Sequence, residues 1–69
     1  MSPDEAERLR TIRRRLALLA APERYRLTEG LALTRSARLS CAGILVAQAR
    51  RRGLVDALEA CLDQRRSAP

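Results

Sequence analysis

The first hydrophobic stripe of the chain has apolar residues at alternating spacings of three and four: Leu9, Ile12, Leu16 and Leu19. This spacing predicts an amphipathic helix. The preceding Ser2-Pro3-Asp4-Glu5 favours a helix start, because Ser2 can cap the first turn, Pro3 suits its first position and Glu5 completes a capping box. Pro22 disfavours a helical Ala21, so we expect this helix to end near Ala20.

The middle of the chain gives weaker signals. Pro22 predicts the start of a second helix that reaches about Leu33, and Gly30 weakens its interior by about 1 kcal/mol relative to alanine. The segment 34–39 is compatible with two structures. It is either a loop or a short helical turn capped by Thr34.

The strongest pattern is a helical hairpin in the last third of the chain. Residues 41–52 are apolar around almost the whole helix circumference and end in three arginines, which predicts a central, buried helix capped by Ser40. Gly53 suits the left-handed position after this helix, and Leu54 can fold back onto its last turn as in a Schellman motif.

The second arm of the hairpin has two distinct faces. Its apolar positions recur at helical spacing and fall together: Leu54, Val55, Leu58, Cys61 and Leu62. Asp56, Glu59 and Asp63 lie on the opposite face, and we expect this acidic stripe to face solvent or a partner. The residues after it, 67–69, are expected to be frayed.

These elements predict an all-α fold, a small four- or five-helix bundle that forms a single domain over residues 1–69. The core must be built from aliphatic side chains, because Phe and Trp are absent and Tyr25 is the only aromatic residue. Such a thin core in a short chain favours self-association or docking onto another protein.

The formal net charge is +6, and all fourteen basic residues are arginines. This balance is compatible with nucleic-acid binding. Lys, Asn and Phe, which AT-rich codons specify, are all absent, so a GC-rich genome would give the same bias without selection for binding. Nucleic acid is therefore the less favoured partner.

The sequence offers no recognisable catalytic chemistry. It has no His, no GxSxG motif, no CxxC pair and no glycine-rich phosphate loop, so we expect no enzyme activity, metal, cofactor or small-molecule substrate. Cys41 and Cys61 are expected to be buried free thiols. No apolar run approaches the roughly 20 residues that span a bilayer, and no signal core begins the chain, so we expect a cytoplasmic protein without membrane contact.

The stretch ILVAQARRRGLVDALEACL, residues 44–62, resembles the last two helices of bacterial effector-associated domains. These are small adaptor modules of the death-like superfamily, found in bacterial conflict and defence systems. Their usual ending is an apolar helix, an A-x-R-x-G turn and a leucine-patterned helix. The resemblance implies a death-like bundle that docks homotypically onto a like module of an effector protease, nuclease or NTPase.

The candidate interface consists of charged faces that such docking could use. It comprises Arg10, Arg13, Arg14 and Leu18 of the first helix, Arg50, Arg51 and Arg52 at the hairpin turn, and Asp56, Glu59 and Asp63 of the last helix. Faces of opposite sign on one molecule allow head-to-tail contacts with another copy or a like module. Reversing the three acidic residues should then abolish association without loss of helicity. The alternatives are a small basic DNA-binding regulator and an antitoxin-like dimer.

Overall fold

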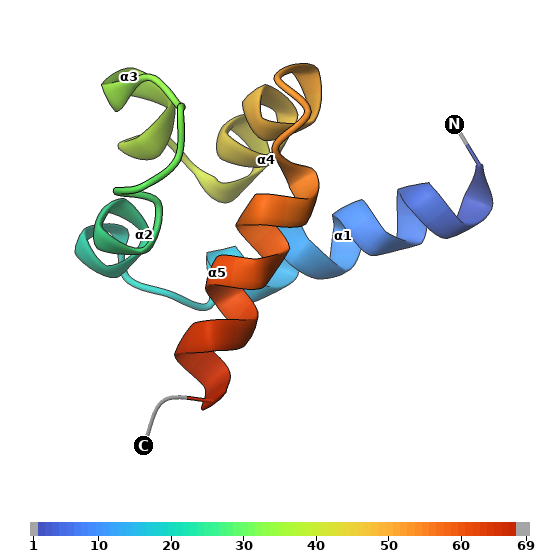
Figure 1. The fold of residues 1–69 in the computed structure, drawn as a ribbon, viewed down its shortest axis with the longest axis horizontal. Helices are drawn as coiled ribbons and strands as arrows, with labels where there is room; N and C mark the ends of the chain where they lie inside the picture. Colours follow the sequence, from blue (N-terminus) through green and yellow to red (C-terminus); the bar gives the residue numbers. More distant parts are fainter. Residues whose placement is uncertain (1, 68–69) are drawn as a thin grey trace.

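The computed structural model describes residues 2–67, and the side chains of residues 2–65. This range forms five helices and no strand: α1 (Pro3–Ala17), α2 (Ala21–Leu27), α3 (Arg35–Arg38), α4 (Ala42–Arg51) and α5 (Val55–Ser67). The predicted all-α, five-helix fold is confirmed. The helix α4 is central, because it packs against α1, α3 and α5, while α2 packs against α5 (Figure 1). The first turns of α1 extend beyond the other helices (Figure 1).

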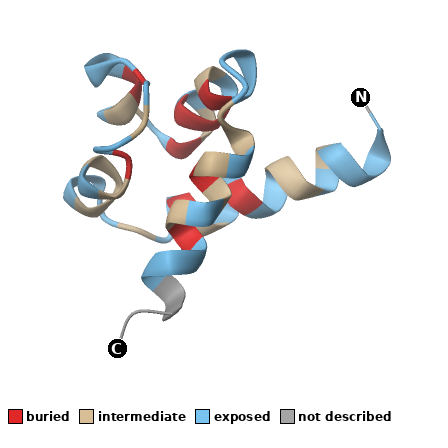
Figure 2. Cartoon of the chain, viewed as in Figure 1, coloured by how far each residue is buried: buried red, intermediate tan, exposed pale blue. Residues whose placement is uncertain are grey.

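The core gathers where α1, α4 and α5 meet. Its buried apolar side chains come mostly from these three helices: Ile12, Leu16, Leu33, Ala42, Leu45, Val46, Ala49, Leu58 and Leu62. Every helix also keeps exposed residues, and the buried segments lie on the inward parts of several elements (Figure 2).

Helix α1 starts as predicted but ends earlier. The Ser2 hydroxyl accepts a hydrogen bond from the Glu5 amide at 3.2 Å. The helix stops at Ala17 instead of Ala20, with Leu18 as its C-cap. The guanidinium of Arg24 donates to the carbonyl of Leu19 at 2.6 Å, which satisfies a backbone group in the turn that follows.

Helix α2 is also shorter than predicted, because a cluster of polar contacts ends it at Leu27 instead of Leu33. The buried Thr28 hydroxyl donates to the Arg24 carbonyl at 2.9 Å. The carbonyl of Tyr25, which a longer helix would use, accepts from the Arg38 guanidinium at 2.5 Å. That guanidinium also lies 3.9 Å from the centre of the Tyr25 ring, a cation–π contact that holds α2 beside α3.

The structure selects the second of the two expectations for residues 34–39. Arg35–Arg38 form a helical turn, and the Thr34 hydroxyl accepts from the Ala37 amide at 3.1 Å. The prediction of Ser40 as the cap of the next helix is wrong. Its hydroxyl donates to the Ser36 carbonyl at 2.6 Å, so Ser40 completes α3, and Cys41 occupies the N-cap of α4 without a side-chain hydrogen bond.

The predicted hairpin turn between α4 and α5 is confirmed. Gly53 has a φ of 68°, the left-handed conformation that glycine adopts without strain. The Leu54 amide donates to the Ala49 carbonyl at 2.7 Å and the Gly53 amide to the Arg50 carbonyl at 3.2 Å, which is the Schellman pattern.

The apolar face of α5 is also confirmed, since Leu58 and Leu62 are buried. Both cysteines are free, but Cys41 is exposed and Cys61 only half-buried, so the expectation of buried thiols is wrong. Ser67 belongs to α5, whereas the other two residues of the expected frayed end, 68 and 69, lie outside the described residues.

Candidate interaction surface

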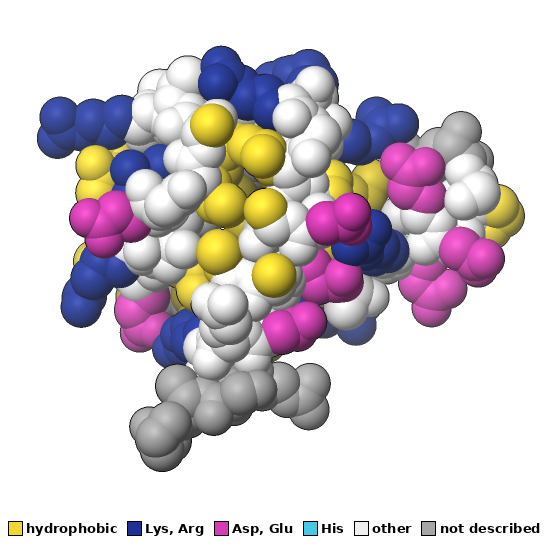
Figure 3. Space-filling view, viewed as in Figure 1, with side chains coloured by type: hydrophobic (Ala, Val, Ile, Leu, Met, Phe, Trp, Pro, Cys, Tyr) yellow, Lys and Arg dark blue, Asp and Glu magenta, His cyan; other side chains and the backbone are white. Residues whose placement is uncertain are grey.

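The acidic stripe of α5 lies beside α1 and is paired with its arginines. Arg8 contacts Asp56 at 2.6 Å and Glu59 at 2.7 Å, and Arg15 contacts Asp63 at 3.0 Å. Acidic and basic side chains accordingly alternate along this edge of α5 (Figure 3). The hydrogen bonds that the Arg8 guanidinium donates to Glu59 and to Asp56 raise its pKa, so it stays charged at any working pH.

This pairing changes the interpretation of the stripe. Asp56 and Asp63 keep 90% and 61% of their side chains exposed, as expected for a solvent-facing stripe. Their charge is nevertheless compensated within the molecule. Reversing these acidic residues would place like charges beside Arg8 and Arg15, so that experiment would test the stability of the fold together with any association.

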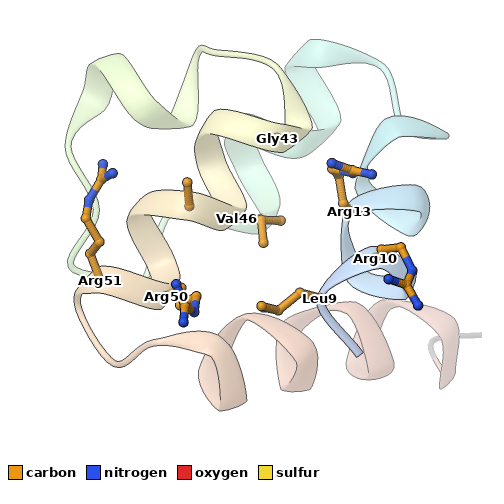
Figure 4. Close-up of a pocket in the computed structure, with 8 residues that line it drawn as sticks. Leu9, Arg10, Arg13, Gly43, Val46, Arg50 and Arg51 are labelled. Carbon is orange, nitrogen blue, oxygen red and sulfur yellow. The ribbon is translucent and has the colours of Figure 1, made fainter. Parts of the chain in front are cut away.

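Four exposed arginines border a groove between α1 and α4. It has a volume of about 410 Å³ and is lined by Leu9, Arg10, Arg13, Gly43, Val46, Ala47, Arg50 and Arg51. Leu9 and Val46 lie between the two helices and form an apolar floor, while Arg10 and Arg13 lie on the α1 side and Arg50 on the α4 side (Figure 4). Four of the predicted interface residues are thus brought together at one site.

The charge in this groove is largely uncompensated. Arg50 contacts the carboxylate of Glu5 at 3.4 Å, with both side chains about half exposed. Among the described side chains, no carboxylate lies within ion-pairing distance of Arg10, Arg13 or Arg51. The groove therefore combines an apolar floor with cationic rims.

Three other predicted interface residues lie elsewhere. Arg14 is exposed on α1 but does not line the groove. Leu18 is 81% exposed and borders a separate shallow hollow beside Leu62. Arg52 donates to the Ala32 carbonyl at 3.0 Å, which ties the end of α4 to the loop before α3. The predicted interface residues of α1 are therefore divided between separate surfaces.

A larger hollow, of about 480 Å³, lies between α2 and α5 and is lined by Glu23, Arg26, Leu27 and Arg65. Its two opposite charges, Glu23 and Arg65, form an ion pair with each other. Leu27 gives it little apolar surface. The α1–α4 groove is smaller but offers both unpaired charge and an apolar floor, so it is the better candidate for a binding surface.

Sequence reasoning did not identify the floor of the groove. The periodic stripe predicts a buried Leu9, and the apolar circumference of residues 41–52 predicts a buried Val46 and Ala47. Val46 is buried, but Leu9 is half-buried and Ala47 exposed. The residue in the sequence that could have indicated a groove is Gly43, because its lack of a side chain leaves room beside α1. A Cβ there would lie 3.8 Å from Cδ of Arg13.

Comparison with protein-family models, with curated proteins and with solved structures finds no significant match to this chain. Within the described residues, no helix has both the length and the apolar character needed to cross a membrane. The same residues contain no group of three or more side chains suited to hold a metal ion.

Proposed function

We propose that this chain is a non-enzymatic adaptor, a protein-interaction module that docks onto a helical domain of an effector in a bacterial conflict or defence system. The observation that carries the proposal is the α1–α4 groove, where Arg10 and Arg13 border an apolar floor, Arg51 lies at the far end, and none of the three has an ion-pair partner among the described side chains. A surface with an apolar centre and a polar rim is the usual anatomy of a protein interface. The resemblance of residues 44–62 to effector-associated domains supports the same conclusion.

The partner is a like module rather than a second copy of this chain. A copy would bring the same net charge of +6, and its α5 carboxylates are already paired with Arg8 and Arg15. Repulsion between like-charged faces suppresses association. A partner with unpaired acidic residues meets neither obstacle, so the docking we propose is between different proteins that share a helical fold.

The alternative function is a small basic DNA-binding regulator or an antitoxin-like dimer, favoured by the net charge of +6 and by the unpaired arginines. A helix-turn-helix protein places the first turns of its second helix in the major groove. Here α4 would take that place, and its first turn carries Ala42, Gly43 and Ile44, none of which can donate to a base edge. This observation favours the adaptor.

The test is pairwise co-expression of this chain with each protein encoded beside its gene that carries a small helical domain. Size-exclusion chromatography with light scattering should then find a complex with at least one of them at about 0.15 M ionic strength. The contrary result is the absence of any complex, together with duplex DNA binding that weakens steeply with salt. A concentration-dependent melt of the chain alone would instead indicate an obligate dimer.

A further inference from the structure

One acidic amphipathic helix already lies against α1, and that helix is α5. Leu58 and Leu62 of α5 belong to the same buried cluster as Ile12 and Leu16 of α1. Beside these leucines, three carboxylates at helical spacing pair with arginines of α1 at 2.6 to 3.0 Å: Asp56, Glu59 and Asp63. The contact therefore consists of an apolar centre flanked by arginine–carboxylate pairs.

The α1–α4 groove also has apolar residues flanked by arginines, but no second helix supplies carboxylates to Arg10 and Arg13. Leu9, Val46 and Ala47 provide apolar surface, and Arg10 and Arg13 flank it on α1 (Figure 4). On the opposite rim, Arg50 already donates to one helix-borne carboxylate, that of Glu5, at 3.4 Å. The rim is thus able to bind a carboxylate presented by a helix.

We infer that the α1–α4 groove binds an acidic amphipathic helix of the partner protein. The apolar side chains of that helix contact Leu9, Val46 and Ala47, and the carboxylates along its edges pair with Arg10, Arg13 and Arg51. The inference rests on the proposed function and specifies which part of the partner docks. A helix in a groove is a common mode of recognition, with apolar anchors one turn apart.

A nucleic-acid backbone fits this site less well. Phosphates would pair with Arg10, Arg13 and Arg51 but would leave the apolar floor without a complementary surface. Phe and Trp are absent from the chain, so stacking of bases on those side chains is excluded. An amphipathic helix satisfies both the charged rims and the floor, and this is why we favour it.

The test uses a fluorescent synthetic peptide of about four helical turns, with leucine along one face and glutamate along both edges. Its binding to the full chain is measured by fluorescence anisotropy. We expect saturable binding that weakens at least about tenfold in Arg13→Glu, because a repulsive charge then borders the bound helix. Arg14→Glu is the matched control, since Arg14 is the adjacent exposed residue of α1 but lies outside the groove. It should change the Kd by less than about twofold.

A second peptide separates docking from general attraction between charges. It keeps every glutamate and replaces the leucines with glutamine, so it should bind much more weakly if the apolar floor contributes. Equal binding of the two peptides, or equal weakening by Arg13→Glu and Arg14→Glu, would overturn the inference. Circular dichroism of both variants shows whether the helices remain intact.

Failure of this inference can be distinguished from failure of the adaptor function. A partner complex that survives Arg10→Glu combined with Arg13→Glu would retain the adaptor and reject the groove as its docking site. Both would be rejected if no partner complex forms and duplex DNA binds in the groove instead. In that case DNA would compete with the peptide, and Arg13→Glu would weaken the binding of DNA.

Discussion

Arg8 and Arg15 of α1 lie against the carboxylates of α5, whereas Arg10 and Arg13 of the same helix border a groove that presents no carboxylate to them. All four arginines belong to one amphipathic helix within two turns of each other. Their different environments arise from the neighbouring helices, because α5 is acidic along its edge and α4 is apolar until its last, basic turn. The edge of α1 toward α5 is closed by ion pairs, whereas its edge along α4 forms an open groove beside the buried α1–α4 contact.

The apolar contacts differ in the same way. On the α5 side, Leu58 is completely buried and Leu62 is 4% exposed. Toward α4, Leu45 and Ala49 are completely buried, but at the edge that forms the groove Leu9 is half-buried and Ala47 is exposed. The arginines that pair with carboxylates thus lie beside buried leucines, while the unpaired arginines lie beside apolar residues that remain partly exposed. The proposed docking of a partner helix in the groove would account for this difference.

The largest expected difference between the two sides is in packing. Leu58→Ala should lower the free energy of unfolding by about 2–5 kcal/mol, because it removes a fully buried side chain and leaves a cavity. That loss is comparable to the whole stability of so small a domain, so much of the protein should be unfolded at 25 °C. Leu9→Ala, at the half-buried floor of the groove, should cost only about 1 kcal/mol. Urea denaturation followed by circular dichroism measures both.

Equal losses for these two variants would contradict the division of α1 into a closed and an open side. The peptide assay provides the complementary measurement. Leu9→Ala should weaken binding of the acidic amphipathic peptide although the fold survives. In Leu58→Ala, any loss of peptide binding should equal the fraction of the protein that is unfolded, because the groove of the folded protein is unchanged.

The next difference concerns charge. Replacing Asp56, Glu59 and Asp63 with Arg should lower Tm by several degrees, because three ion pairs become three repulsive contacts. The effect should be smaller than that of Leu58→Ala, since exposed pairs contribute little in water, and added salt should reduce it. The matched reversal of Arg10 and Arg13 to Glu should leave Tm unchanged or raise it slightly. A triple variant as stable as the parent would show that the α5 pairs are not structural.

Local signals were sufficient to predict most of the fold. The cap at Ser2, the left-handed Gly53 and the apolar periodicity of α5 depend on residues within one or two turns of each other. The length of α2 could not be predicted in this way. It ends early because Arg38, thirteen residues after Tyr25, donates a hydrogen bond to the Tyr25 carbonyl. Such a contact depends on the final position of α3 and has no sequence signal within α2.

The candidate site was predictable only in part. Exposed arginines could be identified from the helical pattern, but which of them are paired depends on the helix packed opposite. The pattern therefore predicted the basic residues of the groove, Arg10, Arg13, Arg50 and Arg51, and missed both the pairing of Arg8 with α5 and the apolar floor. The contacts of α1 with both α4 and α5 supply this missing information.

The smallest expected effect concerns Glu5, whose carboxylate contacts the groove residue Arg50 at 3.4 Å. Glu5→Gln removes a half-exposed ion pair, so the free energy of unfolding should change by less than about 0.5 kcal/mol. In this variant Arg50 has no carboxylate partner, which is already the case for Arg10 and Arg13. Binding of the acidic amphipathic peptide should therefore strengthen by about two- to threefold.

Glu7→Gln is the control, because Glu7 is exposed on the same helix, carries the same charge and has no ion-pair partner among the described side chains. Both variants raise the net charge by one unit, so general attraction would strengthen binding equally in the two. Stronger binding in Glu5→Gln alone would locate the peptide at the Arg50 rim. Weaker binding in Glu5→Gln would mean that the Glu5–Arg50 pair organises the groove, and the open side of α1 would then already be partly assembled without a partner.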